Sequence, residues 1–316
     1  MGVLNVCCYP TKLALHAADH AYVECGGGGY GWGCWGGKNG GTTVRSAHGS
    51  TKRADAIGEP DERAGVTHYL INGVCHQSAN RILMPALITA NGVRGHLLSV
   101  SIFGLFGRPS AGFGMFKAPL YTRAGVSGDL DVCLYQGIHT SSQSRAVAER
   151  GFIDESVRLA REIYPELVLD TDSNLSASQQ TTREPWSSSE AERAAKFQME
   201  SFKLLVRHRA IVTGKRFARA QYHEMMKIRE RFELSREAIE REFVESGQSG
   251  WYRFVRNFDE LTREFQESLA AILPGQDYEA LLDISSDHRM VLSDPDIVES
   301  IYGPESRPRG PGSRSP

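Results

Sequence analysis

The chain has 316 residues, more than one small hydrophobic core needs, which suggests two structural units or one unit with a large extension. It is 41% hydrophobic and 23% charged, and its 36 Lys and Arg residues nearly balance its 38 Asp and Glu residues. A net charge of -2 gives no general reason to bind nucleic acid or an anionic membrane, so we expect neither partner. The longest mainly apolar run, 97–106, is about half the length of a membrane-spanning helix.

Cysteine content and the N-terminal sequence indicate the compartment. Six cysteines are too few for a disulfide scaffold in a chain of this size. The first residues, MGVLNVCCYP, lack the basic and then apolar pattern of a secretory signal. We therefore expect reduced thiols and a cytoplasmic location, with export by a non-classical route left open.

Composition changes along the chain and predicts four segments. Residues 1–168 are Gly-rich with short apolar runs, and 10 of the 16 residues of 26–41 are glycine, which favours loops or a tight hairpin there. Residues 169–190 are rich in Ser and Thr and are predicted to be a linker. Residues 191–303 are predicted to be helical, and residues 304–316 a disordered tail.

Apolar residues recur at about 3.6-residue spacing through the third segment, as in amphipathic helices. Gly214, residues 247–250 and Pro274-Gly275 are the expected breaks, so two or three long helices should form a hairpin or small bundle. The apolar stripes also allow self-association. Residues 191–242 carry a net charge of +5 and residues 243–301 one of -8. These charges either pair along packed helices or, more commonly, lie on solvated faces.

Two segments carry residues capable of catalysis. In HAYVEC, a strand would place His20, Tyr22 and Glu24 on one face. In HYLINGVCHQSANRILMPAL, an apolar run meets Asn-Gly and a helical pattern begins at Cys75, and Pro85 would kink this helix or cut it short. A thiol at a helix N-terminus is expected to have a lowered pKa, and a neighbouring imidazole can take its proton.

These two segments resemble a known superfamily. GVCHQSANRILMPALITANGVRG is similar to the nucleophile helix of transglutaminase-like enzymes, and HAYVEC followed by GYGW is similar to their histidine strand. Here His20 precedes Cys75 by 55 residues, the reverse of the transglutaminase order. That order resembles the circularly permuted papain-like enzymes, such as the lecithin retinol acyltransferase type and related bacterial cell-wall amidases.

The resemblance implies roles for individual residues. Cys75 would be the nucleophile and His20 the acid and base. An acid usually follows the Gly-Trp pair and orients the histidine, but this chain has CWGGKN there, so Asn39 is the nearest polar substitute. Asp19, His48 and Asp55 compete for that role. Further candidates are Gln77 and Asn72 for the oxyanion, and Trp32 and Trp35 for the substrate cleft.

The sequence thus predicts an α+β fold: a papain-like core, with a Cys-bearing helix against a small antiparallel sheet, followed by a helical hairpin or bundle. The expected activity is acyl transfer on an amide through a Cys75 thioester, with a protein or peptide substrate and without a metal or cofactor. One alternative is a non-enzymatic interaction protein with a degenerate papain-like fold. Another is a zinc site made by His16, His20, Cys25 and Cys34, although no CxxC knuckle is present.

Overall fold

The structure is a computed structural model. It describes residues 2–11, 16–26, 30–64, 69–108, 120–121, 142–164, 168–169, 188–246 and 250–302. All statements below concern these residues.

A four-stranded antiparallel sheet forms the N-terminal part, with strand order β3-β2-β1-β4. Its strands are β1 (Gly2–Tyr9), β2 (His20–Cys25), β3 (Tyr30–Trp32) and β4 (Thr42–Gly49). In the register of β1 and β2, Leu4 lies opposite Cys25 and Tyr9 lies opposite His20. The hairpin expected in the Gly-rich stretch is confirmed, because β3 pairs antiparallel with β2.

Two helices pack on this sheet, α1 (Thr51–Ala64) and α2 (Cys75–Leu83). One face of α2 is apolar: Cys75, Ala79 and Ile82 are buried in one cluster with residues of β1, β2 and α1. The predicted effect of Pro85 is also confirmed, since α2 stops at Leu83 and a 3-10 turn follows over Met84–Ala86.

The rest of the described chain is mainly helical. In chain order its elements are α3 (His96–Phe103), β5 (Leu120–Tyr121), α5 (Ser142–Ile163), β6 (Val168–Leu169), α6 (Ser188–Thr213), α7 (Arg219–Glu245), α8 (Trp251–Ile272), α9 (Gly275–Leu282) and α10 (Pro295–Tyr302). The two-residue strands β5 and β6 pair in parallel. The predicted breaks are confirmed: α6 ends just before Gly214, α8 begins directly after Gly250, and α9 begins at Gly275. The fold class is α+β, as expected.

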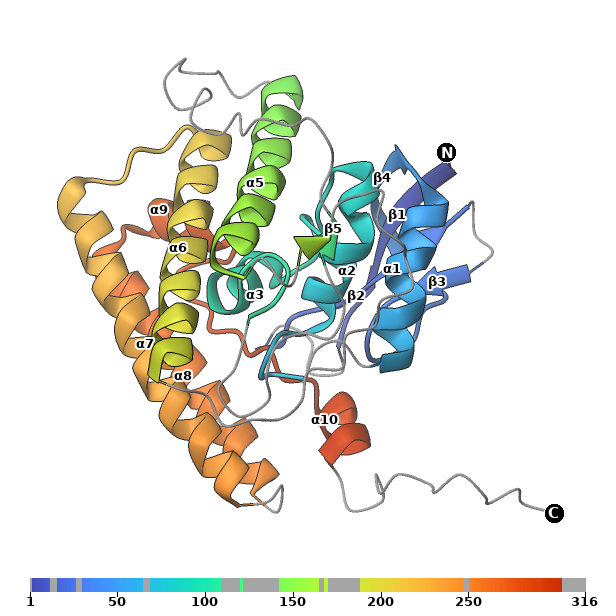
Figure 1. The fold of residues 1–316 in the computed structure, drawn as a ribbon. Helices are drawn as coiled ribbons and strands as arrows, with labels where there is room; N and C mark the ends of the chain where they lie inside the picture. Colours follow the sequence, from blue (N-terminus) through green and yellow to red (C-terminus); the bar gives the residue numbers. More distant parts are fainter. Residues whose placement is uncertain are drawn as a thin grey trace.

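The larger of two hydrophobic cores joins both parts of the molecule. It contains residues from 69 to 106 together with residues of α5 through α10. Figure 1 shows α3 between the sheet side of the molecule and the long helices α5 to α8. Every residue of α3 is buried, which explains why the apolar run 97–106 has no polar face. No helix among the described residues is long and apolar enough to cross a membrane.

The predicted boundaries at residues 168 and 191 stay a prediction. Within the predicted linker, residue 169 belongs to β6 and residues 188–190 to the first turn of α6. Its remaining residues, 170–187, lie outside the described residues, as does the predicted tail 304–316.

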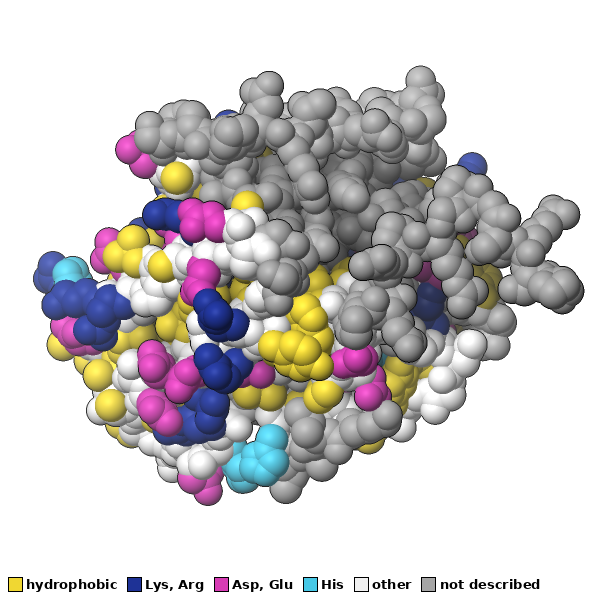
Figure 2. Space-filling view, turned by 90° about the horizontal axis from the view of Figure 1, so that it is seen from below, with side chains coloured by type: hydrophobic (Ala, Val, Ile, Leu, Met, Phe, Trp, Pro, Cys, Tyr) yellow, Lys and Arg dark blue, Asp and Glu magenta, His cyan; other side chains and the backbone are white. Residues whose placement is uncertain are grey.

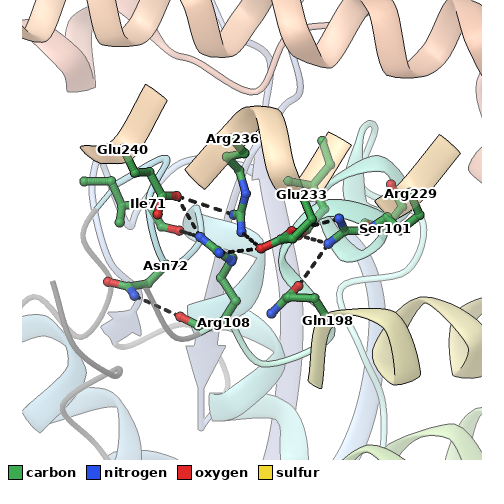
Figure 3. A network of polar contacts seen from close by, with 10 residues as sticks. Ile71, Asn72, Ser101, Arg108, Gln198, Arg229, Glu233, Arg236 and Glu240 are labelled. Carbon is green, nitrogen blue, oxygen red and sulfur yellow. Dashed lines mark hydrogen bonds and ion pairs between the residues drawn. The ribbon is translucent and has the colours of Figure 1, made fainter. Parts of the chain in front are cut away.

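A network of buried charges connects α7 to the N-terminal part (Figure 3). The side chain of Glu233 accepts hydrogen bonds from Arg108 at 2.5 Å, Arg229 at 2.8 Å and Arg236 at 2.5 Å, and Arg108 also donates to Glu240 at 2.7 Å. Arg229 donates further to the backbone oxygens of Ser101 and Ile102, both at 3.0 Å, and to Gln198 at 3.1 Å. The prediction that these charges lie on a solvated face is therefore wrong for Arg229, Glu233, Arg236 and Glu240 of α7, which are buried and paired.

Burial and ion pairing oppose each other at Glu233. Burial alone would raise the pKa of its carboxyl, but the charges of Arg108 and Arg229 outweigh burial and hold the pKa below its ordinary value. Glu233 is therefore ionised near neutral pH, and it compensates guanidinium groups that water does not reach.

We predict that Glu233→Ala lowers the free energy of unfolding by about 3–5 kcal/mol, because it leaves buried guanidinium groups without their carboxylate. Glu230, on an exposed part of the same helix, is the matched control, and Glu230→Ala should change stability by less than about 0.5 kcal/mol. Urea unfolding at pH 7 measures both. Equal, small effects would contradict this account of the network.

Candidate functional site

The Cys75 thiol lies at the start of α2, against the backbone of β2. The amide of Ala21, the residue after His20, donates a hydrogen bond to Cys75 Sγ at 3.4 Å. Gln77 fixes the helix start, because its Oε1 accepts a hydrogen bond from the Val74 amide at 3.0 Å. The structure thus brings the His20 strand and the Cys75 helix together, although 55 residues separate them in sequence.

Burial controls the ionisation of this thiol. Cys75 is 6% exposed, and burial raises the pKa of its thiol to about 12, although hydrogen bonds from the Ala21 and His76 amides act to lower it. The negative charge of Asp294 raises it further. The lowered pKa expected for a helix N-terminus is therefore not found: the resting thiol is neutral.

The His20 ring is fixed by a backbone carbonyl. Its Nε2 lies 3.1 Å from the Gly37 oxygen, and because a carbonyl only accepts, Nε2 carries the proton of the neutral ring. The same oxygen accepts a hydrogen bond from Tyr9 Oη at 2.9 Å, and the Tyr9 and His20 ring centres are 4.7 Å apart. His20 Nδ1 is buried and has no hydrogen-bond partner among the described residues. The unprotonated nitrogen is therefore Nδ1.

Burial also lowers the pKa of His20 to about 4, and the charge of Lys38 acts in the same direction. The ring is neutral at physiological pH. It can accept a proton on Nδ1 only when a reaction supplies one.

Asn39 lies apart from this arrangement. It is an exposed residue of the loop between β3 and β4, whereas the Gly37 carbonyl holds the His20 ring. The three other candidates for orienting His20 are placed elsewhere: Asp19 pairs with Arg94 at 2.5 Å, Asp55 accepts hydrogen bonds from Tyr30 and Trp32, and His48 is exposed on β4.

The amide side chains predicted for the oxyanion are buried in structural hydrogen bonds. Gln77 Nε2 donates to Ser99 Oγ and to the Gly104 oxygen, both at 3.2 Å. Asn72 Nδ2 donates to the Arg108 oxygen at 2.8 Å. In this arrangement both amides hold the loop and the first turn around Cys75.

The two tryptophans predicted for the cleft belong to different parts of the fold. Trp32 donates to Asp55 Oδ1 at 2.8 Å and packs on α1 where Gly58 lacks a side chain, since a Cβ there would lie 2.5 Å from the indole. Trp35 packs edge-on against Tyr69 with ring centres 5.9 Å apart.

Three residues near the thiol were not found from the sequence: Tyr9, Tyr69 and Asp294. The charge of Asp294 acts on Cys75 and on both tyrosines. Its own amide donates to Tyr69 Oη at 2.8 Å, and its carboxylate accepts from the Asp296 amide at 2.9 Å at the start of α10. An Asp before Pro295 is a typical helix N-cap signal, but nothing in it points to Cys75.

The zinc alternative is not supported by the described residues. Within them no three His, Cys, Asp or Glu side chains gather as metal ligands, so His16, His20, Cys25 and Cys34 do not form such a cluster. Cys34 instead donates to the Asp61 backbone oxygen at 3.4 Å.

Comparison with protein-family models, with curated proteins and with solved structures found no match to this chain. The assignment of a function therefore depends on the geometry just described.

We predict that nitrogen-15 NMR of His-labelled protein shows His20 as the neutral Nε2-protonated ring at pH 7, titrating near pH 4. Because the folded pKa lies below the unfolded value of about 6.5, the contribution of His20 to stability is complete above about pH 6.5 and is lost as the pH falls toward 4. Gly36→Ala should shift these signals, since a Cβ there would lie 3.0 Å from His20 Cε1 at a φ of +67°. A ring that titrates near 6.5 would contradict the assignment.

Proposed function

We propose that the chain is a cysteine-dependent acyl transfer enzyme acting on an amide, as a peptidase, amidase, deamidase or transglutaminase-type enzyme. One observation carries the proposal: Cys75 Sγ lies at a helix start 3.4 Å from the amide of Ala21, and the adjacent His20 is fixed through Nε2 with Nδ1 unpaired. A thiol at a helix start and an oriented imidazole on the strand that contacts it are the two groups that thiol acyl transfer requires.

The reaction begins with a neutral pair. As Cys75 Sγ bonds to the substrate carbonyl carbon, its proton passes to His20 Nδ1, and the carbonyl π electrons move to oxygen. When the tetrahedral intermediate collapses, the C–N bond breaks and Nδ1 returns the proton to the leaving amine. Water or an amine then attacks the thioester carbon while His20 Nδ1 takes the proton of that nucleophile. The C–S bond breaks and Nδ1 returns the proton to Cys75 Sγ, which frees the product and restores the neutral thiol.

The Gly37 carbonyl takes the place that an acidic or amide side chain would fill. It accepts from Nε2 and so selects the tautomer in which Nδ1 is the base. Tyr9 shares this carbonyl and packs beside the ring, which limits its rotation. In this proposal Tyr9 and Gly37 position His20, and Asn39 has no catalytic part.

The substrate is proposed to be a protein or peptide. The aromatic rings of Tyr9, Trp35 and Tyr69 lie around the thiol region and would contact a side chain of the substrate. Because Cys75 is only 6% exposed, neighbouring groups would have to move before a substrate could reach Sγ. The reaction needs a reduced thiol and no cofactor, which agrees with the cytoplasmic location expected from the sequence.

A second candidate is an interaction protein without catalysis. Its support is the exposure of large apolar side chains on the C-terminal helices, with Leu234 at 63% and Tyr252 at 67%. Figure 2 shows one face of the molecule, where basic, acidic and hydrophobic side chains are interspersed. A mixed surface of this kind suits a protein partner or self-association better than a nucleic acid.

Labelling of Cys75 by iodoacetamide, followed by peptide mass spectrometry across a pH series, separates the two candidates. In the wild type, base assistance by His20 should give a rate that is nearly constant above about pH 5. In His20→Gln the rate should be at least about 100-fold lower at pH 7 and should rise tenfold per pH unit, because only hydroxide then removes the proton of a thiol with a pKa of about 12.

His48→Gln is the matched control, because it removes an exposed histidine from the same sheet and should leave the labelling profile of the wild type unchanged. The same hydroxide-dependent profile in wild type and His20→Gln would overturn the enzyme proposal and favour the interaction protein.

A further inference from the structure

A cleft of about 780 Å³ opens between β4, the turn at Asn91-Gly92, the start of α5, the end of α6 and the end of α9. Its described lining includes neither Cys75 nor His20. Protein sites for small molecules usually have volumes of about 300–1,000 Å³, so this one is large enough for a small organic ligand.

Charged side chains dominate the cleft: Arg45, Arg145, Arg209, Glu149 and Asp283. Arg45 and Glu149 compensate each other through two parallel hydrogen bonds of 2.7 and 2.9 Å. Glu149 Oε1 also accepts from the amide and the hydroxyl of Thr89. This carboxylate is therefore fully engaged and does not neutralise the other two arginines.

Arg145 and Arg209 remain without a counter-ion at ion-pair distance in the described structure. Arg209 is 6% exposed, and its Nε donates to the Ala280 oxygen at 2.7 Å, while its two terminal nitrogens make no hydrogen bond to a described residue. Arg145 is exposed on α5 and has neither an ion pair nor a hydrogen bond among those residues. Two guanidinium groups in one cleft thus have donors that no described residue occupies.

The two arginines also repel each other. Burial is the main cause that lowers the pKa of Arg209; of the two nearby charges, that of Asp283 raises this pKa, and the smaller effect of Arg145 lowers it. His208 adds no charge, because burial lowers its pKa to about 3. A bound anion would relieve this repulsion and fill the free donors, since guanidinium groups match the geometry of phosphate oxygens.

We propose that this cleft binds a small phosphorylated organic molecule, with its phosphate held by Arg145 and Arg209. The rest of the ligand would occupy the volume beside the polar groups of Asn91 and Asp283. This site is independent of the reaction proposed for Cys75.

Isothermal titration calorimetry tests the proposal with three probes at constant ionic strength: glucose 6-phosphate, inorganic phosphate and citrate. Glucose 6-phosphate should bind saturably at one site per chain. Arg145→Gln and Arg209→Gln should each weaken that binding by at least about tenfold, because each removes a charge-assisted pair.

Arg150→Gln is the matched control, because it makes the same charge change at an exposed position of α5 outside the cleft, and its affinity should stay within about twofold of the wild type. Arg145 is exposed, so Arg145→Gln tests the site without risk to folding even if Arg209→Gln fails to fold. The proposal is overturned if no phosphate probe binds saturably, if citrate binds and neither phosphate probe does, or if Arg145→Gln binds as well as Arg150→Gln.

Discussion

The buried ion pairs of Glu233 determine how the two parts of this molecule fit together. Arg108, which Glu233 and Glu240 hold from α7, is tied through its own backbone to Asn72: its amide donates to the Asn72 oxygen at 2.8 Å, and its carbonyl accepts from the Asn72 side chain. Asn72 lies three residues before Cys75. The position of the thiol therefore depends on a carboxylate more than 150 residues away, and the C-terminal helices are part of the scaffold of the candidate site.

Burial has opposite consequences for the ionisation of Glu233 and for that of Cys75 and His20. At Glu233 several guanidinium groups compensate a buried carboxylate, so the charged state persists without water. At Cys75 and His20 the described residues supply no opposite charge of that strength, and burial leaves both groups neutral. In the proposed reaction, a neutral thiol and a neutral imidazole with a fixed tautomer react only when proton transfer accompanies bond formation. The arrangement favours general-base activation over a preformed thiolate and imidazolium pair.

Features that depend on local pattern could be predicted from the sequence, whereas those made by tertiary contacts could not. The helix start at Cys75, its end before Pro85 and the breaks at Gly214 and Gly275 follow from periodicity and helix-terminating residues. The contact of the Gly37 carbonyl with His20 could not be predicted, because every residue has a backbone oxygen and no side chain marks this one. Arg229, Glu233, Arg236 and Glu240 have the spacing of an ordinary solvated helix face, so only the packing of α7 against α3 and Arg108 reveals that they are buried.

The same contacts explain why the sheet and its two helices are not expected to act alone. Phe103 stacks on Phe258 of α8 with ring centres 5.9 Å apart, Arg45 of β4 pairs with Glu149 of α5, and Tyr69 donates to the Leu292 oxygen beyond α9. Each contact joins a residue before position 110 to a later helix or loop. Without those later elements, Arg108 would lose the two carboxylates that hold it next to the loop that places Cys75. The candidate site around Cys75 and the distant carboxylate of Glu233 therefore belong to one folded unit, and the proposed reaction would require the folded helices.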